Sequence, residues 1–593
     1  MHRDGKPWFG WGAERPICGD HYEAFERLAA QGLRQFHVDA TCSEDIYHPE
    51  LRFWHGPNHF DGSFQHRHLQ RLAEICPDAL LQLRIYVGAP PWWLEQHPAH
   101  CQVFADGHVE HEVQRGGKRK LPSLASPLWR AEACRALKTY IEWLVESGWS
   151  RRVSALFLGY GITWEWGLLG SDDFLDYSEH GQRYFREWRI RHGREPVPIP
   201  SAERRAGAAG TIGMRRVPDE QDVIDHQQSL SDMNADFLLA LADTAKEASG
   251  GQALVGTFYG YTLTAREHSR FMGQYGAGGF QGGHHVLGRV LRSPSVDFLA
   301  SPFSYCDRTL GSGLLFEHVP LASVHAHGKA FFDENDLWAW NNPPKLEAKS
   351  LSVGHTPNIE QTILAHRLAF MQAIVRGKHQ WLTELTDWIG PFGENFSDPQ
   401  LLTEIKRLNL LAEELIQRDR SPAAETAFVL DEKSVAHLSL DNTEFRERIY
   451  KGSVGWGHLG APFDVLLLDD LLDLRDVRYK LVIAAFVKAP GSTRQLEEWS
   501  RSQSQITLSH DTSAALFHEL GRAGVHHYVE EPVTVWANAT MVGVHVDHAA
   551  TRTVRFRSPT KGVEAFSGKL FDAPSGLLTW SFQEKDVALF TTA

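Results

Sequence analysis

Eight short apolar segments alternate with amphipathic helical segments from the start of the chain to about residue 395, and this alternation constrains the fold more than any other feature. Alternation of this kind is typical of a parallel sheet with helical crossovers. Eight such units close most naturally into a (β/α)8 barrel, so we expect an α/β fold with a TIM barrel. A doubly wound open sheet is the alternative. The expected strands span residues 6–12, 33–40, 80–88, 153–163, 253–260, 296–305, 329–334 and 379–385.

The rest of the chain predicts two smaller domains after a barrel domain of residues 1–395. A helical connector over residues 396–420 leads into a second alternating block at residues 421–530, which predicts a small three-layer α/β domain. The tail, residues 531–593, alternates apolar and polar side chains with period two. This pattern predicts a C-terminal antiparallel β domain.

Charge and hydropathy narrow the class of partner. The 593 residues include 60 Lys and Arg against 74 Asp and Glu, a formal net charge of −14, which argues against a nucleic acid or an anionic membrane as the main partner. No apolar run is long enough to span a bilayer, and the first residues do not resemble a signal peptide. We therefore expect a cytoplasmic protein with a small or neutral ligand.

Two residue types bear on cofactors and substrate. The 6 cysteines form no CxxC pair, so reduced thiols are the better interpretation, and we expect neither a metal site nor a cofactor. The 19 tryptophans are unusual. Indole rings that line a pocket fit the apolar faces of sugar rings, which favours a carbohydrate substrate.

Two glutamates follow expected barrel strands and are candidates for catalysis. Residues at the carboxyl ends of barrel strands face the site where barrel enzymes carry out their chemistry. Glu165 follows the fourth strand in "GYGITWEWG", and Glu334 ends the seventh in "FFDEND". Strand alternation puts Glu334 on the same face as Phe332, and the face that leads to Glu165 consists mostly of small residues. Both glutamates thus fall on plausible inward faces.

A pair of facing carboxylates is the machinery of glycoside hydrolysis. One acts as general acid and then general base, and the other attacks the anomeric carbon when the two lie about 5–5.5 Å apart. The alternative for either residue alone is a solvated loop acid, the commonest fate of a glutamate. Their joint position at strands four and seven favours the catalytic interpretation.

The same motifs resemble glycoside hydrolase family 42, the trimeric β-galactosidases of clan A. The similar segments are "GAPPWWLEQHP" (88–98), "GGKRKLPSLASPLWRAEA" (116–133), "ITWEWG" (162–167), "VDFLASPFSY" (296–305) and "GKAFFDEND" (328–336). The resemblance implies a retaining, exo-acting β-glycosidase in which Glu165 is the acid/base and Glu334 the nucleophile. It also implies substrate contacts by Arg119 and Tyr305. Residues 421–530 resemble the trimerisation domain of the family, which implies a homotrimer.

One position departs from the family pattern. Clan A enzymes usually carry Asn before the acid/base, whereas this chain has Trp164. Indole donates one hydrogen bond but accepts none, so recognition of the sugar at C2 is expected to differ. A β-mannosidase or a related glycosidase is therefore the alternative activity. A non-catalytic carbohydrate-binding protein on a barrel scaffold is the alternative from another class.

Several further residues are candidates for substrate binding. Trp338, Trp381 and Trp388 stand at or after the seventh and eighth strands, where they are sugar-stacking candidates or core residues. Glu384 could bind a sugar hydroxyl or pair with a nearby base. Arg84, inside the third strand, is at least as well explained by a buried ion pair as by substrate contact.

Overall fold

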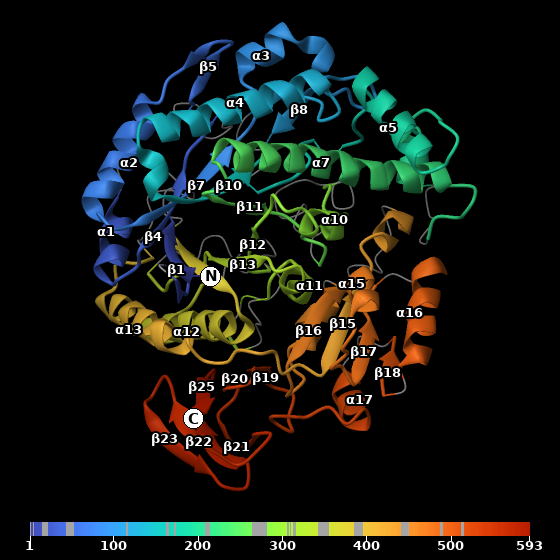
Figure 1. Ribbon diagram of the computed structural model, residues 1–593. Coiled ribbons are helices and arrows are strands. Elements are labelled where there is room, and N and C mark those ends of the chain that lie inside the picture. Colours follow the sequence, from blue (N-terminus) through green and yellow to red (C-terminus); the bar gives the residue numbers. More distant parts are fainter. Residues whose placement is uncertain are drawn as a thin grey trace.

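The structure is a computed structural model in which the barrel, a parallel sheet and a C-terminal β region are distinct (Figure 1). It describes residues 2–592 except residues 4, 15–21, 43–51, 114–116, 162–164, 171–172, 208–213, 264–281, 305–307, 309, 312–315, 342–354, 385–394, 440–448, 450, 487–489, 504 and 511–514.

Eight parallel strands close into a barrel, which confirms the predicted fold class. Around the barrel the order is β10-β11-β12-β13-β14-β3-β4-β7, so the chain adds each strand beside the previous one. The strands are β3 (Trp11–Glu14), β4 (Gln35–Asp39), β7 (Leu80–Tyr86), β10 (Val153–Gly159), β11 (Leu254–Phe258), β12 (Phe298–Pro302), β13 (Ala330–Asn335) and β14 (His379–Thr383). All eight overlap the segments expected from the sequence.

The first barrel strand differs most from its prediction. Residues 6–7 form β2 (Lys6–Pro7), which pairs antiparallel with β1 (His2–Arg3) outside the barrel. Proline has no backbone N–H to donate to a central ladder, so a barrel strand is better begun beyond it. The barrel strand therefore runs over Trp11–Glu14 and carries Glu14 at its carboxyl end.

Helices cover the outside of the barrel (Figure 1). Two of the longer helices begin at local capping signals: Ser126 accepts a hydrogen bond from the Trp129 N–H at the start of α4, and Asn358 accepts one from the Gln361 N–H at the start of α12. The helices of the barrel region, long and short, are α1 (Glu23–Ala30), α2 (Ser63–Ile75), α3 (Pro91–Gln96), α4 (Pro127–Glu146), α5 (Glu179–Arg191), α6 (Ala202–Ala206), α7 (Gln221–Ala248), α10 (Leu287–Leu291), α11 (Leu321–Ala326), α12 (Ile359–Arg376) and α13 (Pro399–Leu415).

Aromatic rings fill the barrel interior. Trp381 stacks on His37 with ring centroids 3.8 Å apart, and Phe157 and Phe332 contact Trp381 from their own strands. The predicted inward faces of the fourth and seventh strands are therefore correct. This packed layer supports the groups that lie at the carboxyl ends of the strands.

A four-stranded parallel sheet follows the barrel, in the order β16-β15-β17-β18. Its strands are β15 (Thr426–Leu430), β16 (Phe463–Leu467), β17 (Leu481–Ala484) and β18 (Thr507–Ser509), accompanied by α14 (Lys451–Trp456), α15 (Leu468–Asp473), α16 (Pro490–Ser502) and α17 (Leu516–Arg522). It joins the barrel where the Ser323 hydroxyl of α11 accepts a 2.8 Å hydrogen bond from the Leu467 N–H.

The C-terminal region is antiparallel and lies against α12 and α13 (Figure 1). Asn538 donates a 2.9 Å hydrogen bond to the Val375 carbonyl of α12, and Arg407 of α13 donates one of 2.7 Å to the Phe566 carbonyl. One sheet contains β19 (Thr534–Ala537), β20 (Met541–His545), β25 (Val587–Thr592), β22 (Thr560–Glu564) and β23 (Lys569–Ala573); β21 (Ala550–Arg555) pairs with β24 (Leu577–Phe582).

Short hairpins and one-turn helices complete the described secondary structure. The hairpins are β5 (Trp54–Gly56) with β6 (His59–Phe60), and β8 (Glu110–Val113) with β9 (Gly117–Lys120). None of the helices in the described part of the chain is both long enough and apolar enough to cross a membrane.

Candidate active site

Arg84 is the central cation at the carboxyl ends of the barrel strands. It lies on β7, is almost fully buried, and forms ion pairs with Glu14 at the end of β3 and with Asp39 at the end of β4, the latter at 3.4 Å. Burial lowers the pKa of Arg84 to about 10, while the negative charges of Glu334 and Glu165 oppose that shift. The guanidinium therefore stays charged at neutral pH.

Glu334 and Glu165 share the electrostatic environment of Arg84. Burial raises the pKa of Glu334 to about 8; Arg84 acts against this rise, and the charges of Asp336 and Glu165 add to it. Like charges in one site oppose each other's ionisation, so the charge of Glu165 makes ionisation of Glu334 less favourable. Arg84 acts in the opposite direction and favours the ionised form of Glu334.

Tyr261 is the direct hydrogen-bond partner of Glu165. Its hydroxyl donates a 2.8 Å bond to Oε1 of Glu165, and both side chains are buried. The ring of Tyr261, just beyond β11, stacks on His318 with centroids 4.7 Å apart. The carboxyl group of Glu165 is thus held by a residue that is itself packed in place.

The backbone around Glu165 is tied to neighbouring strand ends. β10 ends at Gly159, earlier than predicted, and Glu165 lies beyond it. The Gly167 N–H donates a 2.7 Å bond to the Tyr160 carbonyl, and the Trp166 N–H donates one of 3.1 Å to the Phe258 carbonyl. His284 contacts this segment through the Trp166 carbonyl at 2.8 Å. The histidine therefore supports the segment that carries Glu165.

Glu334 differs from its chain neighbours in environment. It is only partly buried, at the inner face of β13. Asp333 points the other way and pairs with buried Lys378 at 2.7 Å, and Asp336 pairs with Arg308 at 2.8 Å. Of these three carboxylates, Glu334 is the one that retains exposed surface without a short ion pair among the described residues.

The predicted substrate-binding residues that the structure describes lie in different settings. Arg119 on β9 donates a 3.4 Å hydrogen bond to the Ala89 carbonyl, beside the end of β7. Glu384 accepts bonds of 3.3 Å from the backbone N–H groups of Asn395 and Phe396. Trp338 is 5% exposed and Trp381 is 0% exposed, so their rings pack inside the protein. Trp164, Tyr305 and Trp388 lie outside the described residues.

Sequence reasoning missed Glu14, Asp39 and Tyr261. Asp39 and Tyr261 stand at or just after correctly predicted strands, so a search of every strand end for polar residues would have found them. Glu14 was missed because the first strand was predicted to end before it.

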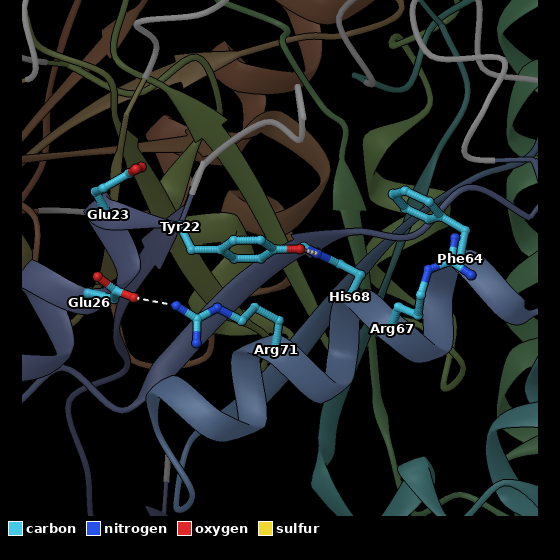
Figure 2. A pocket seen from close by; sticks show the side chains of 7 residues that line it. All are labelled: Tyr22, Glu23, Glu26, Phe64, Arg67, His68 and Arg71. Carbon is cyan, nitrogen blue, oxygen red and sulfur yellow. Dashed lines mark hydrogen bonds and ion pairs between the residues drawn. The ribbon is translucent and has the colours of Figure 1, made fainter. Parts of the chain in front are cut away.

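A hollow between α1 and α2 lies apart from this cluster (Figure 2). Four of its lining residues pair with one another: Arg71 with Glu26 at 2.7 Å, and the Tyr22 hydroxyl with Nδ1 of His68 at 2.7 Å. Burial lowers the pKa of His68 to about 3. The hollow therefore offers no pair of free carboxylates for acid/base chemistry.

Solved structures share this architecture along almost the whole chain. A β-galactosidase from Bacillus circulans sp. alkalophilus superposes with a TM-score of 0.64, covering 99% of each chain at 11% identity. A family 42 β-galactosidase from G. stearothermophilus gives 0.62 at 10% identity, covering 99% of this chain and 98% of its own. The chain has the fold of family 42 β-galactosidases.

An enzyme named for a different substrate also has this fold. A family 42 exo-carrageenase from Bacteroides ovatus gives a TM-score of 0.62 at 11% identity and covers 100% of this chain and 83% of its own. No family model matches the sequence, and no curated protein matches it. The likeness to family 42 enzymes is therefore a likeness of fold, shown by the structural comparison alone.

Proposed function

We propose that this protein is a retaining, exo-acting β-glycosidase, most similar in activity to a β-galactosidase. Glu334 attacks the anomeric carbon, and Glu165 protonates the leaving oxygen and then deprotonates water. The observation that carries the proposal is that Glu165 and Glu334 meet beside Arg84 at the carboxyl ends of the barrel strands. Both carboxylates favour the charged form of Arg84, and the charge of Glu165 helps to raise the pKa of Glu334. The shared fold supports it.

The remaining site groups have supporting roles in this mechanism. Arg84 keeps the ionised form of Glu334 accessible, and Tyr261 orients Glu165. Arg119 and Tyr305 are proposed to contact the sugar, and Trp338, Trp381, Trp388 and Glu384 to shape or support its subsite. No cofactor takes part, and we propose a homotrimer through the parallel-sheet region.

Trp164 motivates the second candidate activity. An indole in place of the usual Asn before Glu165 changes which groups can contact O2 of the sugar. A β-mannosidase or another glycosidase with altered C2 recognition follows from that difference. Equal turnover of C2 epimers would remove the reason for this alternative.

A panel of nitrophenyl glycosides tests both candidates. Wild type should hydrolyse at least one β-glycoside and release the β-anomer first, seen by NMR during early turnover. Glu334→Gln should abolish turnover of every substrate. Glu165→Gln should slow substrates with poor leaving groups far more than nitrophenyl glycosides, because a good leaving group needs little protonation. Exposed Glu179→Gln is the control and should match wild type.

Three results would contradict the proposal. Failure of wild type on the whole panel would favour a carbohydrate-binding protein on a barrel scaffold. Turnover that survives Glu334→Gln would remove Glu334 as nucleophile. Release of the α-anomer first would indicate inversion.

A further inference from the structure

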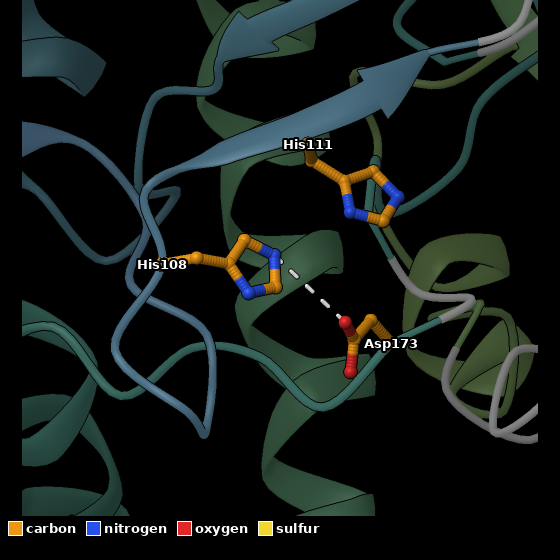
Figure 3. Close-up of side chains that lie close together, drawn as sticks. All are labelled: His108, His111 and Asp173. Carbon is orange, nitrogen blue, oxygen red and sulfur yellow. Dashed lines mark ion pairs between the residues drawn. The ribbon is translucent and has the colours of Figure 1, made fainter.

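Three potential metal ligands meet outside the candidate active site (Figure 3). His108 and His111 belong to the chain between β7 and β9, and Asp173 follows the segment that carries Glu165. One ligand atom from each lies within 4.8 Å of the other two, and Nε2 of His108 is 3.8 Å from Oδ2 of Asp173. All three side chains are partly exposed, so an ion can reach them.

The orientation of His108 is set by a fourth residue. Its Nδ1 lies 2.5 Å from Oδ1 of Asp106, which also accepts a 3.0 Å bond from the His108 N–H. A carboxylate on one ring nitrogen fixes the tautomer and leaves the other nitrogen available for a metal. Here the other nitrogen is the one directed at Asp173.

Packing and backbone contacts hold the other two ligands. Phe104 stacks on both histidines, with its ring centroid 4.3 Å from that of His108 and 4.8 Å from that of His111, and with ring planes tilted by 5° and 18°. Asp173 accepts a 2.6 Å bond from the Phe174 N–H on Oδ1, while Oδ2 is the oxygen nearer His108. The cluster is thus partly pre-organised before any ion binds.

We propose that His108, His111 and Asp173 bind one divalent first-row transition metal ion, with water completing the coordination. Two imidazoles and one carboxylate form a donor set suited to zinc and its neighbours and not to calcium or magnesium. Tetrahedral ligands about 2.0–2.2 Å from zinc lie about 3.3 Å apart. The distances between the ligand atoms must therefore shorten by about 1.5 Å at most. Rotation of the partly exposed side chains can bring this about.

Such an ion would join two segments that border the candidate active site. His111 stands opposite Arg119 in the β8–β9 hairpin, and Asp173 belongs to the chain that follows Glu165. The two segments already touch through a 3.0 Å bond from the Ala105 N–H to the Phe174 carbonyl. The ion would tighten this junction from outside the barrel, and its binding does not depend on the proposed glycosidase activity.

The sequence-based expectation of no metal rested on the spacing of the cysteines and is not informative about histidines. The H-x-x-H spacing of His108 and His111 lacks a third ligand nearby in the chain. Only the contact between distant loops supplies Asp173.

Calorimetric titration of the full chain with Zn²⁺ after chelator treatment tests the site. Wild type should bind one equivalent tightly above the background of its other histidines. His108→Ala, His111→Ala and Asp173→Asn should each lose that equivalent, and Asp106→Asn should keep it with an affinity about 10–100-fold weaker. His548→Ala is the matched control: it removes an exposed histidine 3.5 Å from Asp547 and should bind like wild type.

A second measurement separates a lost ligand from a lost fold. Each variant's circular dichroism and metal-free unfolding midpoint should match wild type, while the rise in midpoint with Zn²⁺ should vanish in the three ligand variants. Substitution with Co²⁺ should give visible absorption of a four- or five-coordinate site in wild type and His548→Ala. The proposal is overturned if wild type shows no stoichiometric binding, or if its equivalent persists when His108 and His111 are replaced together.

Discussion

The hydroxyl of Tyr261 donates a 2.8 Å hydrogen bond to Oε1 of Glu165 and so links the ends of two adjacent barrel strands. Neither residue belongs to a strand: each follows one, where the chain has room to turn its side chain toward the barrel axis. The bond makes Tyr261 a positioning residue for the proposed acid/base.

Tyr261→Phe should lower kcat/KM about tenfold, because this is the usual effect of removing a hydrogen bond to a charged group. A donated hydrogen bond favours the ionised carboxyl, so its loss lets the proposed acid keep its proton to higher pH. The alkaline limb of the pH–rate profile should therefore move to higher pH. Tyr259→Phe is the control, because Tyr259 is equally buried but donates to the Gly283 carbonyl. An unmoved limb in Tyr261→Phe would refute the positioning role.

Arg84→Met should destabilise the fold by about 3–5 kcal/mol at pH 7, because it leaves buried carboxylates without their counter-ion. Without Arg84 the pKa of Glu334 should rise above about 8. Carboxyls with raised folded-state pKa values cost stability once they ionise, so the deficit should shrink as pH falls toward 5. Urea unfolding at the two pH values measures this.

A surface arginine provides the comparison for Arg84. Arg494→Met breaks a 3.7 Å pair with Glu498 in which both side chains are substantially exposed. Such a pair contributes roughly 0–1 kcal/mol, so the variant should unfold at nearly the wild-type urea concentration. Equal losses in the two variants would contradict the central role of Arg84.

Gly161→Ala should displace the chain that carries Glu165. Gly161 has φ +148°, and a Cβ there would lie 2.2 Å from the Glu165 carbonyl oxygen. Movement of a catalytic group by about 1 Å can cost about 100-fold in rate, so kcat should fall by that order. Gly167→Ala, where a Cβ meets nothing within 4 Å, should retain activity. Wild-type kcat in Gly161→Ala would show that this close approach does not position Glu165.

Glu432→Gln should make the protein more stable than wild type at alkaline pH. Burial raises the pKa of Glu432 to about 8, although the hydrogen bonds that it accepts from the backbone N–H groups of Gly288 and Leu287 act to lower it. This value lies above that of an unfolded glutamate, about 4.3, so wild type loses stability as pH rises from about 4.5 to 8. The glutamine does not titrate. The difference should grow with pH across that window, by about 1.4 kcal/mol per unit at most.

Glu404→Gln should show the opposite pH dependence in the same unfolding experiment. Burial of Glu404 acts to raise its pKa, but Arg367 and Arg407 more than offset this and hold it below the usual value. Stability from this group is present above the unfolded pKa and lost as pH falls through the folded one. The variant should therefore be less stable than wild type at neutral pH and converge with it in acid. Matching profiles for the two variants would refute both assignments.

The amino-acid sequence by itself determined the barrel and its two proposed catalytic residues. Apolar periodicity and turn residues are local properties, so all eight strands could be found from short windows. The period of two along a strand is also local, which is why Phe332 and Glu334 could be assigned to the inner face of the seventh strand.

Only the tertiary structure decided which distant groups act on one another. Glu14, Asp39 and Arg84 meet because three neighbouring parallel strands bring their carboxyl ends to the same edge of the barrel, and Tyr261 reaches Glu165 from the end of the adjacent strand. Asp173 joins His108 for the same reason. Electrostatic coupling and metal chelation depend on separation in space and on exclusion of water, and neither quantity exists until the chain has folded.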